Sequence, residues 1–321
     1  MLLGGKGSFR TGTAYLVVGT EDVTGGRFDG RRLRYRADAG SARKIDMPTT
    51  TNGEVSLYYE TFGAETDPTL LLVNGLGSQC INFKVEFCQA FAEEGFRVVR
   101  FDNRDVGLSS HLDGGARYTV NDMAADGFAV LDAVGSDAAH IAGWSMGGMI
   151  VQAMAIEHPE RVLSIASVMS APGPLTGERP ADVAAAFTAP PATSRDEAAE
   201  RHLAGLRAWG SPTCFDVERI TADAHAAYDR CWDPEGRGRQ AMAISSSPSR
   251  AEALRSLRVP ALVIHGDADR LVPLEEGRAT AEAIPGARLE IVEGMGHDYP
   301  PQFWPRMVEL ITTHARSAVA P

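Results

Sequence analysis

The hydrophobic and polar positions become regularly patterned from about Glu54 onward, and two kinds of segment then alternate along the chain. Short, continuous apolar runs predict strands that are buried on both faces, because a half-buried strand would alternate apolar and polar residues. Longer stretches of helical character separate these runs, which indicates a parallel sheet with helices on both faces. The predicted strands cover residues 55–61, 70–73, 97–101, 139–142, 162–169, 259–266 and 288–292.

The alternation is interrupted between residues 172 and 250, where no convincing strand occurs. Proline, glycine and serine divide this segment into short stretches that are typical of helices. We therefore expect an α/β core formed by residues 47–171 and 251–321, with residues 172–250 inserted as a helical cap. The predicted helices in the core are 119–134, 150–158, 274–284, 301–316 and one that carries Phe83, Phe87, Phe91 and Ala92 on one face. Those in the insert are 181–187, 194–209, 216–232 and 237–245.

Residues 1–46 differ in composition from the rest of the chain. The segment is rich in glycine and arginine, and its nine Lys and Arg against five Asp and Glu give a net charge of +4. It shows no sustained periodicity, so we expect an extension that is disordered or not part of the native protein. Its apolar run at residues 14–18 is too short for the core of a signal peptide, and no cleavage motif follows it.

Composition and charge narrow the classes of function. The chain has 321 residues, of which 44% are hydrophobic and 23% charged, as is usual for a globular protein. Its net charge of −11 would repel the phosphates of a nucleic acid, and no apolar stretch approaches the roughly 18 residues of a membrane-spanning helix. The four cysteines form no C-x-x-C pair, which favours free thiols in a reducing compartment. We therefore expect a cytoplasmic protein without a membrane span or a nucleic-acid partner.

The sequence Gly143-Trp144-Ser145-Met146-Gly147 follows one predicted strand and precedes a predicted helix. Such a Gly-x-Ser-x-Gly turn presents a nucleophilic serine, because residues without bulk on either side let the backbone turn sharply. The N-terminus of the following helix would also favour the negative charge that develops when the serine attacks a carbonyl. Ser145 is therefore the predicted nucleophile.

A serine nucleophile needs a base, and the chain contains eight histidines. His297 is the one that lies in a glycine-rich loop directly after a late predicted strand, where its ring can reach the sheet edge that carries Ser145. A carboxylate that orients this imidazole is expected after an earlier strand, where both Asp267 and Asp269 are candidates. The chain order Ser, Asp, His is the order expected of one particular fold.

Two backbone N–H groups are expected to stabilise the oxyanion of the reaction. One belongs to Met146, the residue after the nucleophile, and the other most simply to Leu76 in the loop after residues 70–73. Gly75 and Gly77 flank Leu76 and free that backbone to turn inward. Loss of one such donor typically costs about 10²–10³ in rate, so the conformation of this loop should matter for catalysis.

From about Val55 to the C-terminus the chain resembles the α/β-hydrolases, which implies the α/β-hydrolase fold: a mostly parallel central sheet flanked by helices, with an inserted helical cap. The loop at residues 101–107 and the sequence Gly-Met-Gly-His-Asp further resemble a bacterial carboxylesterase group that includes aclacinomycin methylesterase-like enzymes. The resemblance implies that Asp269 is the acid that orients His297. Its motifs are Asn74-Gly75-Leu76-Gly77, Gly143-Trp144-Ser145-Met146-Gly147-Gly148, His265-Gly266-Asp267-Ala268-Asp269 and Gly294-Met295-Gly296-His297.

The chain departs from this family at one position of the loop after residues 70–73. The family usually has His-Gly where this chain has Asn74-Gly75. Since asparagine can also hydrogen-bond the loop, we expect an intact oxyanion hole that is held by a different contact.

The predicted function is a serine hydrolase that cleaves carboxylic esters through Ser145, His297 and Asp269 and an acyl-enzyme intermediate, with no cofactor or metal. We expect a small, apolar, ester-like substrate, whereas its identity and the oligomeric state are not predicted. The same triad serves carbon–carbon bond hydrolases, acyltransferases and cofactor-free perhydrolases, and a slow-turnover ligand-binding receptor is the alternative from another class. Apolar residues of the insert that could line the pocket are Phe187, Leu203, Leu206, Trp209, Phe215, Tyr228, Trp232 and Met242.

Overall fold

The computed structural model of the protein describes residues 48–175 and 177–319, and the prediction for residues 1–46 lies outside this part of the chain. Its strands are β1 (Thr49–Asn52), β2 (Val55–Phe62), β3 (Thr69–Val73), β4 (Arg97–Phe101), β5 (Ala139–Trp144), β6 (Val162–Val168), β7 (Ala261–Gly266) and β8 (Arg288–Val292). Its helices are α1 (Val85–Glu93), α2 (Val120–Ala133), α3 (Met146–Glu157), α4 (Ala181–Phe187), α5 (Arg195–Trp209), α6 (Val217–Arg230), α7 (Pro234–Ser246), α8 (Ala251–Leu254), α9 (Leu274–Ala283) and α10 (Trp304–Val319).

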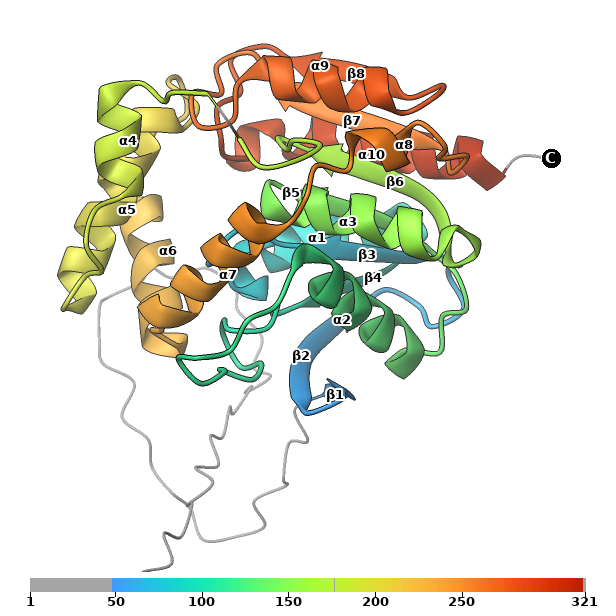
Figure 1. Ribbon diagram of the computed structural model, residues 1–321, viewed down its shortest axis with the longest axis horizontal. Coiled ribbons are helices and arrows are strands. Elements are labelled where there is room, and N and C mark those ends of the chain that lie inside the picture. Colours follow the sequence, from blue (N-terminus) through green and yellow to red (C-terminus); the bar gives the residue numbers. More distant parts are fainter. Residues whose placement is uncertain (1–47, 176, 320–321) are drawn as a thin grey trace, which may run out of the picture. The chain divides into compact units, whose positions relative to one another are not determined.

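The strands form one eight-stranded sheet in the order β1-β2-β4-β3-β5-β6-β7-β8. The strands from β4 to β8 in this order run parallel, whereas β1 and β2 at one edge pair antiparallel. Figure 1 shows the helices packed around this sheet. The predicted, mostly parallel sheet flanked by helices is therefore confirmed.

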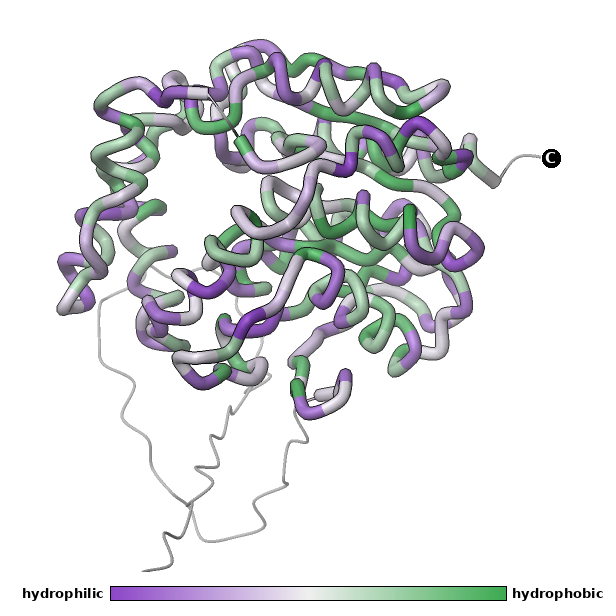
Figure 2. The backbone as a smooth tube through the Cα atoms, viewed as in Figure 1, coloured by the Kyte–Doolittle hydropathy of each residue, from purple (hydrophilic) through white to green (hydrophobic). Residues whose placement is uncertain are grey.

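Alternate residues of the central strands point to opposite faces of the sheet and build two separate hydrophobic cores. On β3, Leu71 and Val73 pack on the face covered by α2 and α3, whereas Leu70 and Leu72 pack on the face covered by α1 and α10. All four side chains are buried, which explains why the strand has a continuous apolar sequence. The colouring of Figure 2 shows the same concentration of hydrophobic residues in the centre of the molecule.

Several elements differ from the prediction by a few residues, among them α10, which covers Trp304–Val319 rather than 301–316, and three differences have a clear physical reason. The edge strand β1 was not predicted because its sequence, Thr-Thr-Thr-Asn, is polar and none of its residues is buried. Helix α3 begins at Met146 rather than at residue 150. Its first turn was not predicted because the early glycines have low helix propensity and the buried positions give no amphipathic pattern. Helix α7 begins at Pro234 rather than at residue 237, with Asp233 as its N-cap.

Helices α4 to α7 occupy the chain between β6 and β7 and lie at one end of the ribbon in Figure 1. Hydrogen bonds join them to the loops that follow β3, β4 and β8. These helices therefore cover the edge of the sheet at which the parallel strands end. Within residues 48–175 and 177–319, no helix has the length and apolar character needed to cross a membrane.

Candidate active site

The turn at Ser145 is the one exposed point in a long buried stretch. Strand β5 ends at Trp144 and α3 begins at Met146, so Ser145 alone makes the turn. Its backbone has φ 56° and ψ −118°, a conformation that residues with side chains rarely adopt. Every other residue from Ala139 to Ala155 is buried, whereas Ser145 is partly exposed. The strained turn therefore presents the serine hydroxyl and buries its neighbours.

Two glycines leave the space that this turn requires. A Cβ on Gly143 would lie 2.1 Å from the carbonyl oxygen of Gly147. A Cβ on Gly147 would lie equally close, 2.1 Å, to the carbonyl oxygen of Val73 on β3. Both distances are far shorter than a van der Waals contact, so any larger residue would push the turn away from the sheet.

The structure brings Ser145, His297 and Asp269 into one hydrogen-bonded series, although they come from three separate motifs. His297 Nε2 lies 2.9 Å from Ser145 Oγ, and His297 Nδ1 lies 2.7 Å from Asp269 Oδ2. The Asp269 side chain is fully buried, and the His297 side chain is 9% exposed. When the carboxylate holds a proton on Nδ1, Nε2 remains free to accept the hydroxyl proton of the serine. The arrangement suits a serine that acts as a nucleophile.

The two candidate carboxylates have different partners. Asp269 Oδ1 accepts hydrogen bonds from two backbone N–H groups of the following turn, each at 2.9 Å, which leaves Oδ2 directed at His297. Asp267 Oδ1 instead accepts from the N–H of Gly294 at 2.7 Å, shortly before His297 in the chain. Asp269 thus contacts the imidazole itself, whereas Asp267 fixes the loop that carries it.

The loop after β3 lies against the predicted nucleophile. A Cβ on Gly75 would lie 3.2 Å from Ser145 Cβ and 3.8 Å from Ser145 Oγ. Among the described residues, no hydrogen-bond acceptor faces the N–H of Leu76, the next residue. The N–H of Met146 is the first of α3 and so has no acceptor inside the helix. The backbone N–H groups of Leu76 and Met146, both in segments next to Ser145, are therefore free to donate a hydrogen bond to a substrate.

Asn74 stabilises this loop from inside the protein. Its side chain is fully buried, and its Nδ2 donates to the carbonyl oxygen of Gln79 at 3.0 Å. The carbonyl oxygen of Asn74 in turn accepts from Asn103 Nδ2 at 3.1 Å. The hydrogen bond expected from Asn74 to its own loop is therefore present.

Two contacts from the inserted helices hold the loops of the site, and neither was predicted from the sequence. Gln240 of α7 is fully buried; its Oε1 accepts from the N–H of Gly77 at 2.8 Å, and its Nε2 donates to the carbonyl of Arg104 at 2.7 Å. The carbonyl of Trp209 at the end of α5 accepts from the N–H of His297 at 2.7 Å. No local pattern distinguishes Gln240, because its partners are remote in sequence.

Two further ionisable side chains adjoin the series. His265 on β7 is fully buried, and burial lowers the pKa of its imidazole, which keeps it neutral. Its Nε2 donates to the carbonyl of Val272 at 2.9 Å and lies 3.6 Å from Asp269 Oδ2, so it leaves that carboxylate to His297. Burial raises the pKa of Asp298, whose Oδ1 accepts from the N–H of Ser211 at 2.8 Å.

The apolar residues predicted to line a pocket have several environments. Leu206 and Phe215 line a cavity of about 460 Å³ that Asp269 also borders. Phe187 and Trp209 pack edge to face, with ring centroids 6.4 Å apart, inside a small cluster of the insert. In the part of the chain that the structure describes, no group of three His, Cys, Asp or Glu residues has the arrangement of a metal site.

Comparison with known proteins identifies the family. The family described as alpha/beta hydrolase fold matches residues 68–211. Rhodomycin D methylesterase DauP of Streptomyces sp. (strain C5) is 31% identical in an alignment of 301 positions that covers 85% of this chain and 99% of that protein. Two solved structures superpose with TM-scores of 0.70 and 0.71: the enol-lactonase from Burkholderia xenovorans LB400 and the meta-cleavage product hydrolase CumD from Pseudomonas fluorescens IP01. The enol-lactonase is 23% identical to this chain and the CumD hydrolase 20% identical. Each superposition covers 84% of this chain, together with 100% of the enol-lactonase and 98% of CumD.

The chain belongs to the α/β-hydrolase family, which confirms the predicted fold. Within this family it resembles the bacterial esterases of the aclacinomycin methylesterase-like group, as its motifs predict. The comparisons accordingly support a carboxylic ester hydrolase.

Proposed function

We propose that the protein is a serine esterase in which Ser145, His297 and Asp269 form the catalytic triad. The observation that carries this proposal is the hydrogen-bonded series at the strained turn, with distances of 2.9 and 2.7 Å. Each part of an ester hydrolysis then has a candidate atom: a hydroxyl that attacks, an imidazole that accepts its proton, and a carboxylate that orients the imidazole.

In the acylation step, His297 Nε2 takes the proton of Ser145 while Oγ attacks the carbonyl carbon of the ester. The carbonyl oxygen becomes an oxyanion, for which the N–H groups of Leu76 and Met146 are the proposed donors. The Asp269 carboxylate stabilises the imidazolium that forms. His297 then protonates the departing alcohol, and the acyl group remains on Ser145.

The deacylation step repeats this chemistry with water as the nucleophile. His297 removes a proton from water as the water oxygen attacks the acyl carbon, and the same N–H groups hold the second oxyanion. Collapse of this intermediate returns the proton to Ser145 Oγ and releases the carboxylic acid. The proposal uses only groups of the protein and involves no cofactor or metal.

We further propose that residues 172–250 act as a cap that shapes the substrate pocket. Helices α4 to α7 cover the edge of the sheet at which Ser145 lies, and a cap of this kind excludes water from the reaction. Leu206 and Phe215 of this segment line a cavity that borders Asp269 but is lined by neither Ser145 nor His297, and we propose that an apolar part of a small ester extends toward it. Because the relative DauP is named as a methylesterase, methyl esters are the first substrates to test.

The cysteines bear on the proposed cellular location. All four are free thiols, two of them buried and two of intermediate exposure. We propose that the protein acts in the cytoplasm, where reducing conditions keep such thiols free.

A panel of methyl and p-nitrophenyl esters, with products identified by mass, tests the proposed reaction. We expect many turnovers per protein, an acid and an alcohol as products, and stoichiometric labelling of Ser145 by a serine-directed phosphonate. A single slow turnover would instead indicate a binding receptor. Products of carbon–carbon cleavage, of acyl transfer or of peracid formation would identify one of the alternatives on the same triad, and labelling of another serine would contradict the assigned nucleophile.

A further inference from the structure

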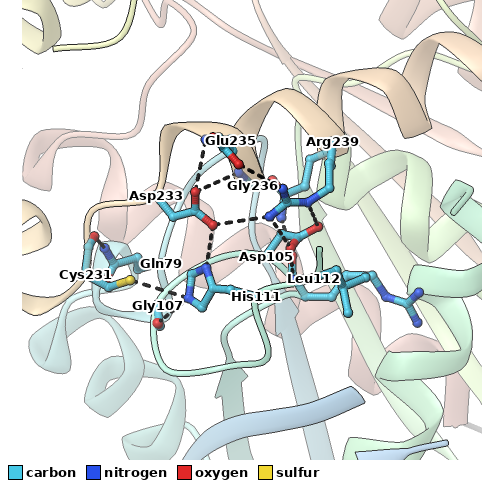
Figure 3. A network of polar contacts seen from close by, with 12 residues as sticks. Gln79, Asp105, Gly107, His111, Leu112, Cys231, Asp233, Glu235, Gly236 and Arg239 are labelled. Atoms are coloured by element: carbon cyan, nitrogen blue, oxygen red, sulfur yellow. Dashed lines mark hydrogen bonds and ion pairs between the residues drawn. The ribbon is translucent and has the colours of Figure 1, made fainter. Parts of the chain in front are cut away.

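A second series of nucleophile, imidazole and carboxylate lies where α6 ends and α7 begins (Figure 3). Cys231 Sγ lies 3.4 Å from His111 Nε2, and His111 Nδ1 lies 2.6 Å from Asp233 Oδ2. None of these residues takes part in the proposed ester hydrolysis. Cys231 has intermediate exposure and the His111 side chain is 31% exposed, so the series lies near the surface of the protein.

Both ring nitrogens of His111 face acceptors, which favours the doubly protonated, positively charged ring. Nδ1 faces the Asp233 carboxylate, and Nε2 lies 3.0 Å from the carbonyl oxygen of Gly107 as well as near Cys231. The hydrogen bond with Cys231, together with those to Gly107 and Asp233, raises the pKa of His111 to about 10. An imidazolium that contacts a thiol favours the thiolate, which is the nucleophilic form of cysteine.

The carboxylate that orients His111 is itself fixed by α7. Asp233 Oδ1 accepts from the N–H groups of Glu235 and Gly236, each at 3.0 Å, as the N-cap of the helix. Its other oxygen, Oδ2, also lies 3.3 Å from Arg239 Nη2. The imidazole is therefore held in one orientation, as His297 is held by Asp269.

Other charges around the sulfur only partly oppose the thiolate. Cys231 follows the C-terminus of α6, where the helix carries only about half a negative charge, whereas the imidazolium in contact carries a full positive charge. Each nearby acid has a cationic partner: Asp102 pairs with Arg230 at 2.7 Å, whereas Asp233 shares Arg239 with Asp105 and also contacts His111. The direct contact with His111 therefore dominates.

We propose that Cys231 is a site of covalent modification by small soft electrophiles, in particular small-molecule disulfides. The thiolate sulfur attacks one sulfur of the disulfide, a new S–S bond forms as the old one breaks, and the other half leaves as a thiolate that takes a proton from water. Cys231 is oxidised to a mixed disulfide while the leaving sulfur is reduced, so the exchange needs no further oxidant. The proposal is independent of the esterase activity.

The other cysteines provide controls within the same chain. Cys214 has the same intermediate exposure as Cys231, but among the described residues its Sγ has only the Thr213 hydroxyl as a polar neighbour, at 3.7 Å. Cys80 and Cys88 are buried, and burial raises the pKa of both thiols, that of Cys88 to about 12. Cys214 is therefore the matched reference and the two buried thiols should stay unmodified.

The test is the rate at which iodoacetamide alkylates each cysteine of the folded full chain at pH 7, measured by peptide mass. A soft electrophile reacts with the thiolate form, so a cysteine whose sulfur contacts an imidazolium should react faster than one without such a neighbour, partly offset because a stabilised thiolate is a weaker nucleophile. We expect Cys231 to react about fivefold faster than Cys214, or more. A small aromatic disulfide should form a mixed disulfide on Cys231 first.

Two variants test whether the His111 imidazole causes the fast alkylation of Cys231. His111→Gln should lower the Cys231 rate to about that of Cys214 and leave Cys214 unchanged. Asp233→Asn keeps an N-cap side chain on α7 but removes the negative charge that orients His111. We expect an alkylation rate of Cys231 between those of the native protein and His111→Gln. This variant also provides the test if His111→Gln does not fold. Equal rates at Cys231 and Cys214 in the native chain, or an unchanged Cys231 rate in a folded variant, would overturn the proposal.

Discussion

Ser145 and Cys231 each lie in a hydrogen-bonded series of nucleophile, imidazole and carboxylate, yet opposite ends of helices adjoin them. Ser145 directly precedes the N-terminus of α3 and contacts the loop that carries the unengaged N–H of Leu76. Cys231 follows the C-terminus of α6, where carbonyl oxygens rather than N–H groups are exposed. An imidazole and a carboxylate can activate a nucleophile at either place, but ester turnover also needs donors for the oxyanion. We therefore expect turnover at Ser145 and only a stable adduct at Cys231.

The largest effect should follow from Ser145→Ala. Removal of the nucleophile of a serine hydrolase typically lowers kcat by about 10⁶, because only weak stabilisation of the transition state remains. Esterase assays and phosphonate labelling should both show the loss, while circular dichroism shows an intact fold. Alkylation of Cys231 should keep its native rate, which separates the two centres; substantial esterase activity in the variant would refute the assignment.

Asp269→Asn should have the second largest effect. An asparagine keeps the shape but supports the wrong tautomer of His297 and does not stabilise its positive charge, which typically costs about 10⁴ in kcat. The measurement is kcat on one ester, with the thermal midpoint as a check of folding. A loss of less than tenfold would show that Asp269 does not orient the base.

Gln240→Leu should reduce kcat by about 10- to 100-fold, less than the loss of a whole oxyanion donor, because the loop is disturbed rather than removed. Gln240 holds the N–H of Gly77, next to Leu76, and should therefore act mainly on kcat with KM little changed. Ser245→Ala, an exposed position of the same helix, is the matched control and should leave both constants unchanged. A folded Gln240→Leu protein with native kcat would show that α7 does not position this loop.

Asp267→Asn should cost only a few-fold in kcat, because an amide oxygen can still accept from the N–H of Gly294. Its main effect should be a lower thermal midpoint, as the loop before His297 becomes less firmly held. Comparing kcat of Asp267→Asn and Asp269→Asn on the same ester shows which carboxylate orients His297. If Asp267→Asn is the more damaged variant, the assignment of the acid is wrong, although Ser145 and His297 would keep their roles.

Cys231→Ser should have the smallest effect on the esterase, within about twofold of the native kcat, a change typical of a surface substitution. The serine hydroxyl still fits beside His111, so the junction of α6 and α7 should remain intact. Alkylation at position 231 should disappear in the same protein. A large loss of esterase activity would show that the two centres are coupled through the inserted helices.

Much of this fold could be predicted because a strand buried on both faces has a recognisable sequence. β3 is the clearest case, since Leu70 to Val73 are all buried. Helix α3 shows where such reasoning fails: its buried positions and its early glycines hide the point at which the helix begins, at Met146. The pattern of apolar and polar residues thus predicts an amphipathic helix or a fully buried strand well. It predicts less well the ends of a helix that is buried on all sides.

The sequence by itself determined which residues are candidates for the site. Ser145 and His297 each stand in a short glycine-rich motif between predictable elements, and Asp267 and Asp269 follow one strand together. The spacing left both carboxylates open and the family resemblance favoured Asp269, but only the tertiary structure brings its carboxylate to the imidazole, since side chains two positions apart in a turn can point in different directions. It alone also placed Gln240 beside Gly77 and Cys231 beside His111, because such contacts depend on how distant helices and loops pack together.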